Sequence, residues 1–178
     1  FANREQAFRV MDSSVGDLLN EKLGKKGYTA LGYMELGSRN ATNNVRPLKT
    51  LEDFKGLKIR LQPNETHLAT FRAIGANPVS MGIKEVYSAM QQGVLDGQEN
   101  PFSIIATKRF DEVQKYRADS GHFFDFIILV ANKRKFEKMS AATQDAVRKA
   151  TAKAIAWQRA KAAEEDVASV KELQKRGM

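Results

Sequence analysis

The chain has 178 residues and a formal net charge of +8, and 42% of its residues are apolar. An apolar share of this size can fill a buried core, so the composition excludes a disordered or fibrous protein. Cysteine is absent, which excludes disulfides, thiolate catalysis and cysteine-bound metals. The longest apolar stretch, Phe123 to Ala131, is interrupted by Asp125 and is too short to cross a bilayer.

Neither the histidines nor the positive net charge indicates a metal site or a nucleic-acid surface. His67 and His122 are the only histidines, and neither has a second histidine at helical spacing, so we expect no metal site. Between Lys133 and Arg176 there are twelve basic and six acidic side chains. Because the two signs alternate along a predicted helix, we interpret this segment as a solvated helix face rather than a nucleic-acid surface.

Two short helices open the chain. Asn3 is placed to cap the first helix, and Ser13 or Ser14 to cap a second one that ends before Gly27. Residues 28–36 then predict a buried strand, and we expect a polar loop that contains Arg39 to follow it.

The middle of the chain alternates between helix and strand. Thr50 and Asp53 predict a capping box at a single helical turn, and Leu57–Leu61 predicts a strand with Arg60 near its end. Asn64 is placed to cap the next helix, which Gly75 closes. This alternation is typical of an α/β protein with a parallel or mixed sheet covered by helices.

Further elements follow the same pattern. The predicted segments are a strand at 78–81, a helix at 84–92, a strand at 94–96 and a central strand at 123–130. Asn100 is expected as the N-cap of a helix in which Pro101 is the first residue. From Ser140 a helix is predicted almost to Gly177, roughly 50 Å long at 1.5 Å per residue.

Arg60 is the most suggestive single residue, because a guanidinium presents a planar fork that matches a carboxylate with two hydrogen bonds. Its position alone also suits an ordinary surface residue on a strand. Glu35 and Glu99 are candidate acids or bases, although each also suits a solvated strand end. No phosphate-loop, dinucleotide-binding or nucleophile-elbow motif is present.

Four segments carry a resemblance to a known family: TLEDFKGLKIR at 50–60, GANP at 75–78, EVYSAMQQGVLDGQENP at 85–101 and KRFDEVQKY at 108–116. In order and spacing they closely resemble the DctP-type family of TRAP transporter solute receptors, and weaker similarity extends over the whole chain. The resemblance implies a two-lobed, type II-like periplasmic-binding-protein fold of the α/β class, with the long C-terminal helix bridging the lobes.

The resemblance also implies a domain division. Residues 1–36 and 124–163 are expected to be the remnant of the first lobe, and residues 37–123 and 164–178 the second lobe with the end of the bridging helix. The family's opening strands and helices have no counterpart before Phe1, and its C-terminal tail has none after Met178, so we expect a fragment with an incomplete first lobe.

Five site residues follow from the resemblance. It implies that Arg60 forms a salt bridge with the ligand carboxylate and that Arg39 and Asn100 support the same carboxylate. Asn64 matches a position that contacts the rest of the ligand. Ile83 is expected to line the pocket where many members carry an aromatic side chain, which leaves the identity of the ligand open.

The function implied is that of a periplasmic, extracytoplasmic receptor that delivers a small organic acid to TRAP membrane permease subunits. A C4-dicarboxylate or a sugar acid is favoured, and neither cofactor, metal nor catalytic residue is expected; a signal peptide is expected in the precursor. Two alternatives stay open: a carboxylate-acting enzyme with Glu35 or Glu99 as base, and a basic module that binds nucleic acid or an acidic partner.

Overall fold

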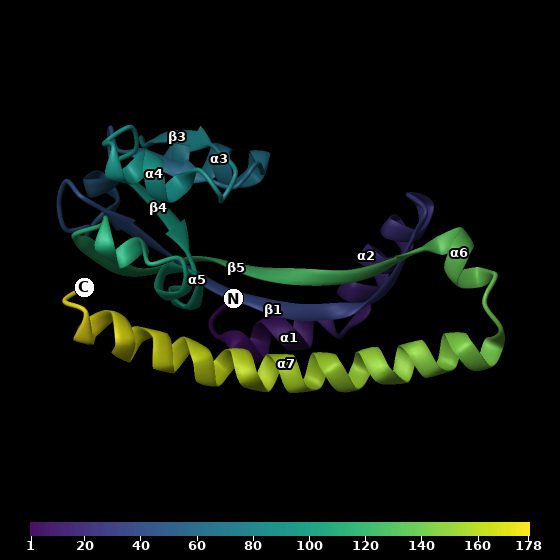
Figure 1. Cartoon of the computed structure of the whole chain (residues 1–178). Helices are drawn as coiled ribbons and strands as arrows, with labels where there is room; N and C mark the ends of the chain where they lie inside the picture. Colours follow the sequence, from purple (N-terminus) through teal and green to yellow (C-terminus); the bar gives the residue numbers. More distant parts are fainter. The chain divides into compact units, whose positions relative to one another are not determined.

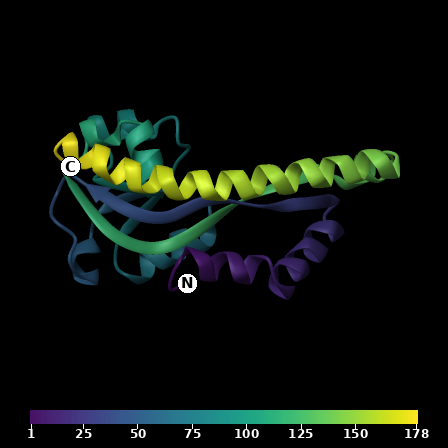
Figure 2. The ribbon, with the colours of Figure 1, turned by 90° about the horizontal axis from the view of Figure 1, so that it is seen from below.

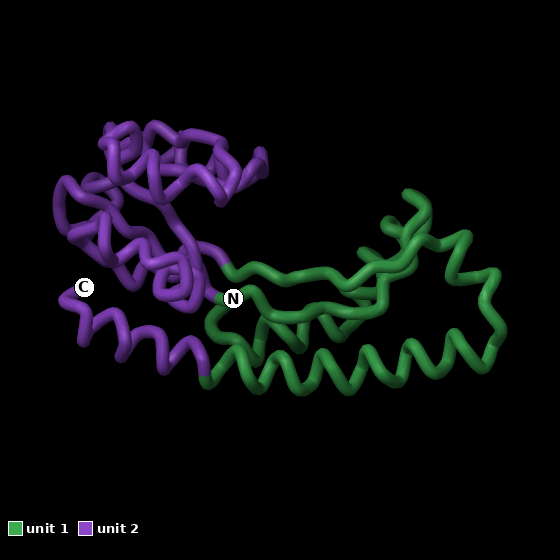
Figure 3. Tube along the Cα trace, viewed as in Figure 1, with its two compact units in different colours: residues 1–37, 124–164 green, residues 38–123, 165–178 purple.

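The computed structural model describes all 178 residues and divides into two compact units (Figure 3). Unit 1 comprises residues 1–37 and 124–164, and unit 2 comprises residues 38–123 and 165–178. Three elements contribute residues to both units: β1 (Tyr28–Asn43), β5 (Tyr116–Asn132) and α7 (Ala141–Lys175). No helix combines the length and the apolar character needed to span a membrane.

Unit 1 begins with two capped helices, α1 (Arg4–Met11) and α2 (Ser14–Lys25) (Figure 1). The Asn3 side chain accepts a hydrogen bond from the backbone of Gln6, which confirms the predicted cap of α1. Of the two serines considered for the second cap, Ser13 is the one used, since its Oγ accepts from the backbone N–H of Val15.

Within unit 1, α7 lies close to β1 at a glycine. A Cβ atom on Gly32 would lie 2.3 Å from Cδ1 of Ile155, and Gly32 has φ +143°, so both space and backbone favour glycine here. Nearby, the Gln158 side chain joins β1 to α7 through two hydrogen bonds of 2.9 Å with the backbone N–H and C=O of Glu35.

A short helix, α6 (Lys133–Glu137), precedes the long helix α7 and is capped by Asn132. Helix α7 then runs without interruption for 35 residues (Figure 2). Ser140 Oγ accepts from the backbone N–H of Thr143 at 3.2 Å, which confirms the predicted start of this helix. Its length of about 50 Å follows from the helical rise.

Unit 2 contains the short strands of the sheet: β2 (Lys58–Leu61), β3 (Asn77–Ser80) and β4 (Gly97–Asn100). The strand order is β3-β2-β4-β1-β5. β2 pairs in parallel with both β3 and β4, whereas β1 pairs antiparallel with β4. The predicted α/β class with a mixed sheet is therefore confirmed.

The strand predicted as central at 123–130 is β5, which begins at Tyr116 and lies at the edge of the sheet. Two further strand predictions are wrong. The strand that begins at residue 28 does not end at 36 but continues to Asn43, so Arg39 lies in a strand and not in a loop. The strand expected at 94–96 lies instead at Gly97–Asn100. Both errors have one cause: these strands bury polar side chains, such as Thr42 and Gln98, that hydrogen-bond to each other and leave no hydrophobic pattern.

The helices of unit 2 pack around two apolar clusters. One cluster joins η1 (Leu51–Phe54) and α3 (Glu65–Ala73) to the sheet through Ile59 and Leu61. The predicted capping box of Thr50 and Asp53 at η1 is confirmed. The other cluster gathers side chains from three further helices, α4 (Val86–Gln91), α5 (Phe102–Thr107) and the end of α7, and η2 (Phe110–Glu112) contributes Phe110.

Candidate carboxylate-binding site

One edge of the unit 2 sheet collects the ends of three parallel strands. Because β2 is parallel to β3 and to β4, their carboxyl ends at Leu61, Ser80 and Asn100 face the same way. Ligands in α/β proteins characteristically bind outside the carboxyl ends of such strands. The residues at this edge are therefore the first place to look for a site.

Arg60 lies at this edge with its guanidinium buried and only partly bonded. The residue is 3% exposed, and its Nε donates to the carbonyl oxygen of Met81, just past β3, at 2.8 Å. The two terminal nitrogens of Arg60 form neither a hydrogen bond nor an ion pair with the protein. Burial lowers the pKa of Arg60, as expected for a cation removed from water, while the nearby Glu99 acts to raise it.

Arg39, in contrast, is held by a carboxylate. Its Nε donates to Oε2 of Glu99 at 2.5 Å and its Nη2 donates to Oε1 at 2.7 Å. Nη2 also donates to the backbone oxygen of Glu99 at 2.8 Å. Both side chains are at most 1% exposed, so this is a buried, bidentate ion pair between β1 and β4.

Asn100 completes this network, and its predicted capping role is wrong. Its Oδ1 accepts from Nη2 of Arg39 at 3.1 Å and its Nδ2 donates to Oε1 of Gln98 at 2.6 Å. The cap of α5 is Pro101, with ψ 151°, and the helix begins at Phe102. Asn100 is the last residue of β4, and its side chain bonds to Arg39 on β1 and to Gln98 within β4 rather than to the first turn of α5.

His122 is a member of the network that the sequence reading missed. Its Nε2 lies 3.2 Å from Oε2 of Glu99, and its Nδ1 lies 2.9 Å from Oγ of Ser120. Burial acts to raise the pKa of Glu99, but hydrogen bonds from His122 and Arg39 outweigh burial and hold the pKa below its ordinary value. Residues 99 and 122 are too far apart in the sequence for any local pattern to predict their contact. It becomes visible only in the folded sheet.

The other two predicted site residues occupy loops after β2 and β3. Asn64 is exposed and caps α3, where its Oδ1 accepts from the backbone N–H of His67 at 3.2 Å, while its Nδ2 has no partner in the protein. Ile83 is half-buried and packs against the apolar cluster around α4. Their contact with a ligand stays a prediction, as do the ligand roles of Arg39, Arg60 and Asn100.

The two glutamates considered as catalytic bases are both bound by arginines. Glu99 pairs with Arg39, and in unit 1 the carboxylate of Glu35 accepts from Nε and Nη2 of Arg4 at 2.9 and 2.6 Å. A general base needs its lone pair for the substrate proton, and such ion pairs compete for it. In this structure no group of three or more His, Cys, Asp or Glu side chains is placed to hold a metal ion.

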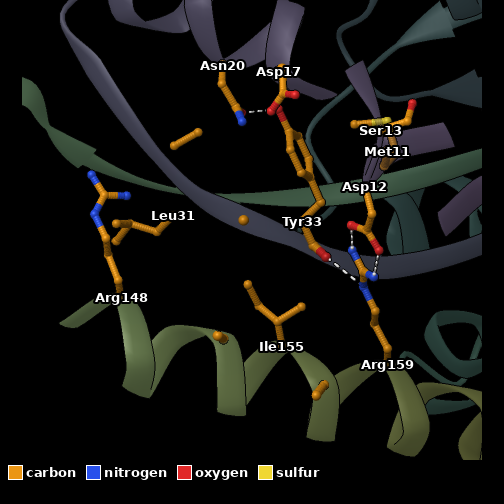
Figure 4. A pocket seen from close by; sticks show the side chains of 14 residues that line it. Met11, Asp12, Ser13, Asp17, Asn20, Leu31, Tyr33, Arg148, Ile155 and Arg159 are labelled. Carbon is orange, nitrogen blue, oxygen red and sulfur yellow. Dashed lines mark hydrogen bonds and ion pairs between the residues drawn. The ribbon is translucent and has the colours of Figure 1, made fainter. Parts of the chain in front are cut away.

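A separate hollow of about 520 Å³ lies in unit 1, between α2, β1 and α7 (Figure 4). Two of its charged groups pair with each other: the guanidinium of Arg159 donates to both oxygens of Asp12, at 2.6 and 2.9 Å. Tyr33 donates its hydroxyl to Asn20 at 2.7 Å, and burial, followed by the charge of Asp17, raises the pKa of Tyr33. Arg60 is not among the residues that line this hollow.

Known proteins share this arrangement of strands and helices. The structure superposes on a TRAP periplasmic solute-binding protein from a Polaromonas species bound to D-erythronate, with a TM-score of 0.95 and 34% identity, over 100% of this chain and 59% of that one. A second such protein, from Sulfurospirillum deleyianum with bound succinate, gives a TM-score of 0.91 at 34% identity over 98% and 56%. The fold is thus that of a periplasmic binding protein.

The sequence gives the family. It is 36% identical over 165 residues to the 2,3-diketo-L-gulonate-binding periplasmic protein YiaO of Escherichia coli, which is 93% of this chain and 50% of that protein. The model of the DctP family, described as bacterial extracellular solute-binding protein, family 7, matches residues 1–178, and the chain belongs to this family. The chain spans about half the length of the curated relatives it matches.

Proposed function

We propose that this protein is the extracytoplasmic, periplasmic receptor of a TRAP transporter and that it binds a small organic acid for delivery to membrane permease subunits. The observation that carries the proposal is Arg60, a buried arginine at the carboxyl edge of three parallel strands with both terminal nitrogens unused by the protein. A carboxylate matches these two donors in charge and geometry.

The relatives agree with this chemistry. D-Erythronate, succinate and 2,3-diketo-L-gulonate, the ligands named for the proteins described above, are all organic acids. These relatives are binding proteins and not enzymes, in agreement with the arginine pairing of Glu35 and Glu99. In the proposed role Arg60 pairs with the ligand carboxylate, while Arg39 and Asn100 support it through the Glu99 network.

The test is a binding screen with the full-length protein and a panel of mono- and dicarboxylates, read out by thermal shift and then by calorimetry. A ligand that binds only the folded state raises the melting temperature. We expect one chemical group of acids to bind and Arg60→Ala to weaken that binding at least roughly thirtyfold, as removal of a buried charge partner costs about 2–5 kcal/mol. An Arg60→Ala variant with unchanged affinity contradicts the proposal.

A further inference from the structure

The imidazole of His122 is held in one orientation beside the carboxylate of Glu99. Its Nε2 lies 3.2 Å from Oε2 of Glu99, and its Nδ1 lies 2.9 Å from Oγ of Ser120. Phe71 of α3 and Phe123 of β5 pack edge-on against the ring, with centroids at 5.2 and 4.9 Å. The side chain is 18% exposed, so protons from the solvent still reach it. His122 therefore combines a fixed position with access to water.

Both protonation states of His122 fit these contacts without repacking. In the neutral ring, Nε2–H donates to the carboxylate of Glu99 and Nδ1 accepts from the hydroxyl of Ser120. In the protonated ring both nitrogens donate, and the Ser120 oxygen, which already accepts from the backbone N–H of Ala41 at 3.1 Å, accepts from Nδ1 as well. Only one hydroxyl hydrogen turns between the two states. An imidazole in water titrates at about pH 6.5, so histidine is the residue type that changes its charge near neutral pH.

The charges that face His122 come from the three neighbouring strands of the sheet. Glu99 of β4 contacts the ring directly, and Arg39 of β1 donates to both oxygens of the same carboxylate, at 2.5 and 2.7 Å. Arg60 of β2 lies opposite Gln98 in the pairing of β2 with β4, one residue before Glu99. The charges of Glu99 and Arg39 both act on its guanidinium. His122 thus belongs to the electrostatic surroundings of the arginine that is proposed to hold the ligand.

Two further titratable groups lie near this ring. His67 of α3 stacks on Phe123 with centroids 4.0 Å apart, and its Nδ1 lies 3.3 Å from Nε2 of Gln62. On β5 itself, the carboxylate of Asp119 pairs with Arg117 at 3.2 Å. Phe123 contacts both imidazoles, so His67 is the group whose titration has to be separated from that of its neighbour.

We propose that His122 takes up a proton when an organic acid binds at Arg60, and that the affinity for the acid consequently rises as the pH falls. A protonated imidazole adds one positive charge to the surroundings of a site that binds an anion, so the anion binds more tightly to the protonated form. Because linkage is reciprocal, the ligand-bound protein then holds more protons than the free protein. The inference rests on the proposed arginine–carboxylate function and adds a dependence on pH to it.

Calorimetry measures this proton uptake directly. D-Erythronate, D-galactonate, 2,3-diketo-L-gulonate and succinate are titrated into the full-length protein between pH 6 and pH 8, in pairs of buffers with different ionisation enthalpies. The difference in the heat of binding between two buffers gives the number of protons taken up. For the acid that binds most tightly, we expect fractional uptake at pH 7 and an affinity at least about threefold higher at pH 6 than at pH 8, as one added charge in a partly screened site produces. Equal affinity at both pH values without proton uptake overturns the inference and leaves the arginine–carboxylate function standing.

His122→Gln separates the titration of the imidazole from its hydrogen bonds. The amide of glutamine donates to Glu99 as the neutral imidazole does, but it does not titrate. We expect this variant to lose both the proton uptake and the rise in affinity from pH 8 to pH 6. His67→Gln, which removes the other histidine of the chain, is the matched control and keeps the ratio of the two affinities. A His122→Gln variant that retains the full pH dependence, or a His67→Gln variant that abolishes it, contradicts the role of His122. Failure of every acid to bind at any pH contradicts the function itself.

Discussion

The guanidinium of Arg39 and the carboxylate of Glu99 form a bidentate ion pair that is almost completely buried between β1 and β4. Taking two charges out of water is unfavourable, and further hydrogen bonds offset this cost: Asn100 accepts from Arg39, and His122 lies 3.2 Å from the carboxylate of Glu99. The stability of the sheet therefore depends on the pair being intact.

Removal of one partner is expected to destabilise unit 2 strongly. Glu99→Ala leaves the buried Arg39 without its carboxylate, so we expect a loss of about 3–5 kcal/mol in the free energy of unfolding, measured by urea denaturation. The double variant Arg39→Met, Glu99→Leu is expected to lose clearly less, because it leaves no unpaired charge. A double variant as unstable as the sum of the two single variants would contradict this account.

The carboxylate of Glu99 also predicts that the folded protein loses stability at acidic pH, which gives the curve of stability against pH an acid limb. The pKa of Glu99 in the folded protein lies below its ordinary value of 4.5, so the unfolded chain binds the proton first as the pH falls. The stabilisation is thus complete above about pH 4.5 and is lost as the pH drops through the lower folded-state pKa. Melting temperatures measured from pH 6 to pH 2.5 should fall in the wild type.

Two variants separate Glu99 from other carboxylates in this pH range. Glu99→Gln is expected to flatten the acid limb. Asp53 also has a lowered pKa, caused first by hydrogen bonds from the backbone of Lys49 and Thr50, but it is only half-buried, whereas Glu99 is fully buried. Asp53→Asn should therefore change the fall in melting temperature at acidic pH only slightly. An effect as large as that of Glu99→Gln would contradict the assignment of this fall to Glu99.

Arg60 is expected to reduce stability in the absence of ligand. Its guanidinium is buried without an ion pair, so replacement by an apolar side chain of similar length removes a desolvated charge. We expect Arg60→Met to raise the unfolding free energy of the ligand-free protein by about 1 kcal/mol and the melting temperature by about 2–4 °C, while abolishing ligand binding.

The control for this trade-off is an arginine of the surface. Arg72 is exposed and only loosely paired with Glu65 at 3.6 Å, so Arg72→Met should leave both the melting temperature and the ligand affinity unchanged. A ligand-free Arg60→Met variant that melts well below the wild type would show that Arg60 stabilises the fold, contrary to expectation.

Gly97 is expected to tolerate no side chain. A Cβ there would lie 2.0 Å from the carbonyl oxygen of Thr42 on the paired strand β1, so an added side chain would force one of the two hydrogen-bonded backbones to shift. Gly97→Ala should cost about 3 kcal/mol in the free energy of unfolding, measured by chemical denaturation. Gly24→Ala, inside α2 with its nearest atom at 4.0 Å, is the matched control and should stabilise by about 0.5–1 kcal/mol.

Local signals predicted the helices well. The caps at Asn3, Asn64 and Ser140 and the capping box at Thr50 are all observed, because a side chain within three residues decides each helix start. The long helix α7 was equally predictable from the sequence, because its 35 residues contain no glycine or proline that would end a helix.

The buried polar strands could not be read in this way. The second half of β1 and all of β4 are stabilised by side chains such as Arg39, Thr42 and Gln98, which look like loop residues until the strands pair. For the same reason the sequence marked Glu99 as a possible base and gave no role to His122. Arg60 carried a local signal through its strand, whereas Arg39, Asn64, Ile83 and Asn100 were expected at the site only from the family resemblance.

The division into two units affects how the gene can be modified. The chain passes between the units at residues 37–38, 123–124 and 164–165, so each unit consists of two separate stretches of sequence. A simple truncation therefore never isolates one unit. Exchange of unit 2 with that of a relative requires replacement of residues 38–123 and 165–178 together, so that Leu173 keeps the core of α4 and α5 that evolved with it. Recombination at a single point between Phe110 and Leu173 would yield a chimera whose second apolar cluster combines side chains from two different proteins.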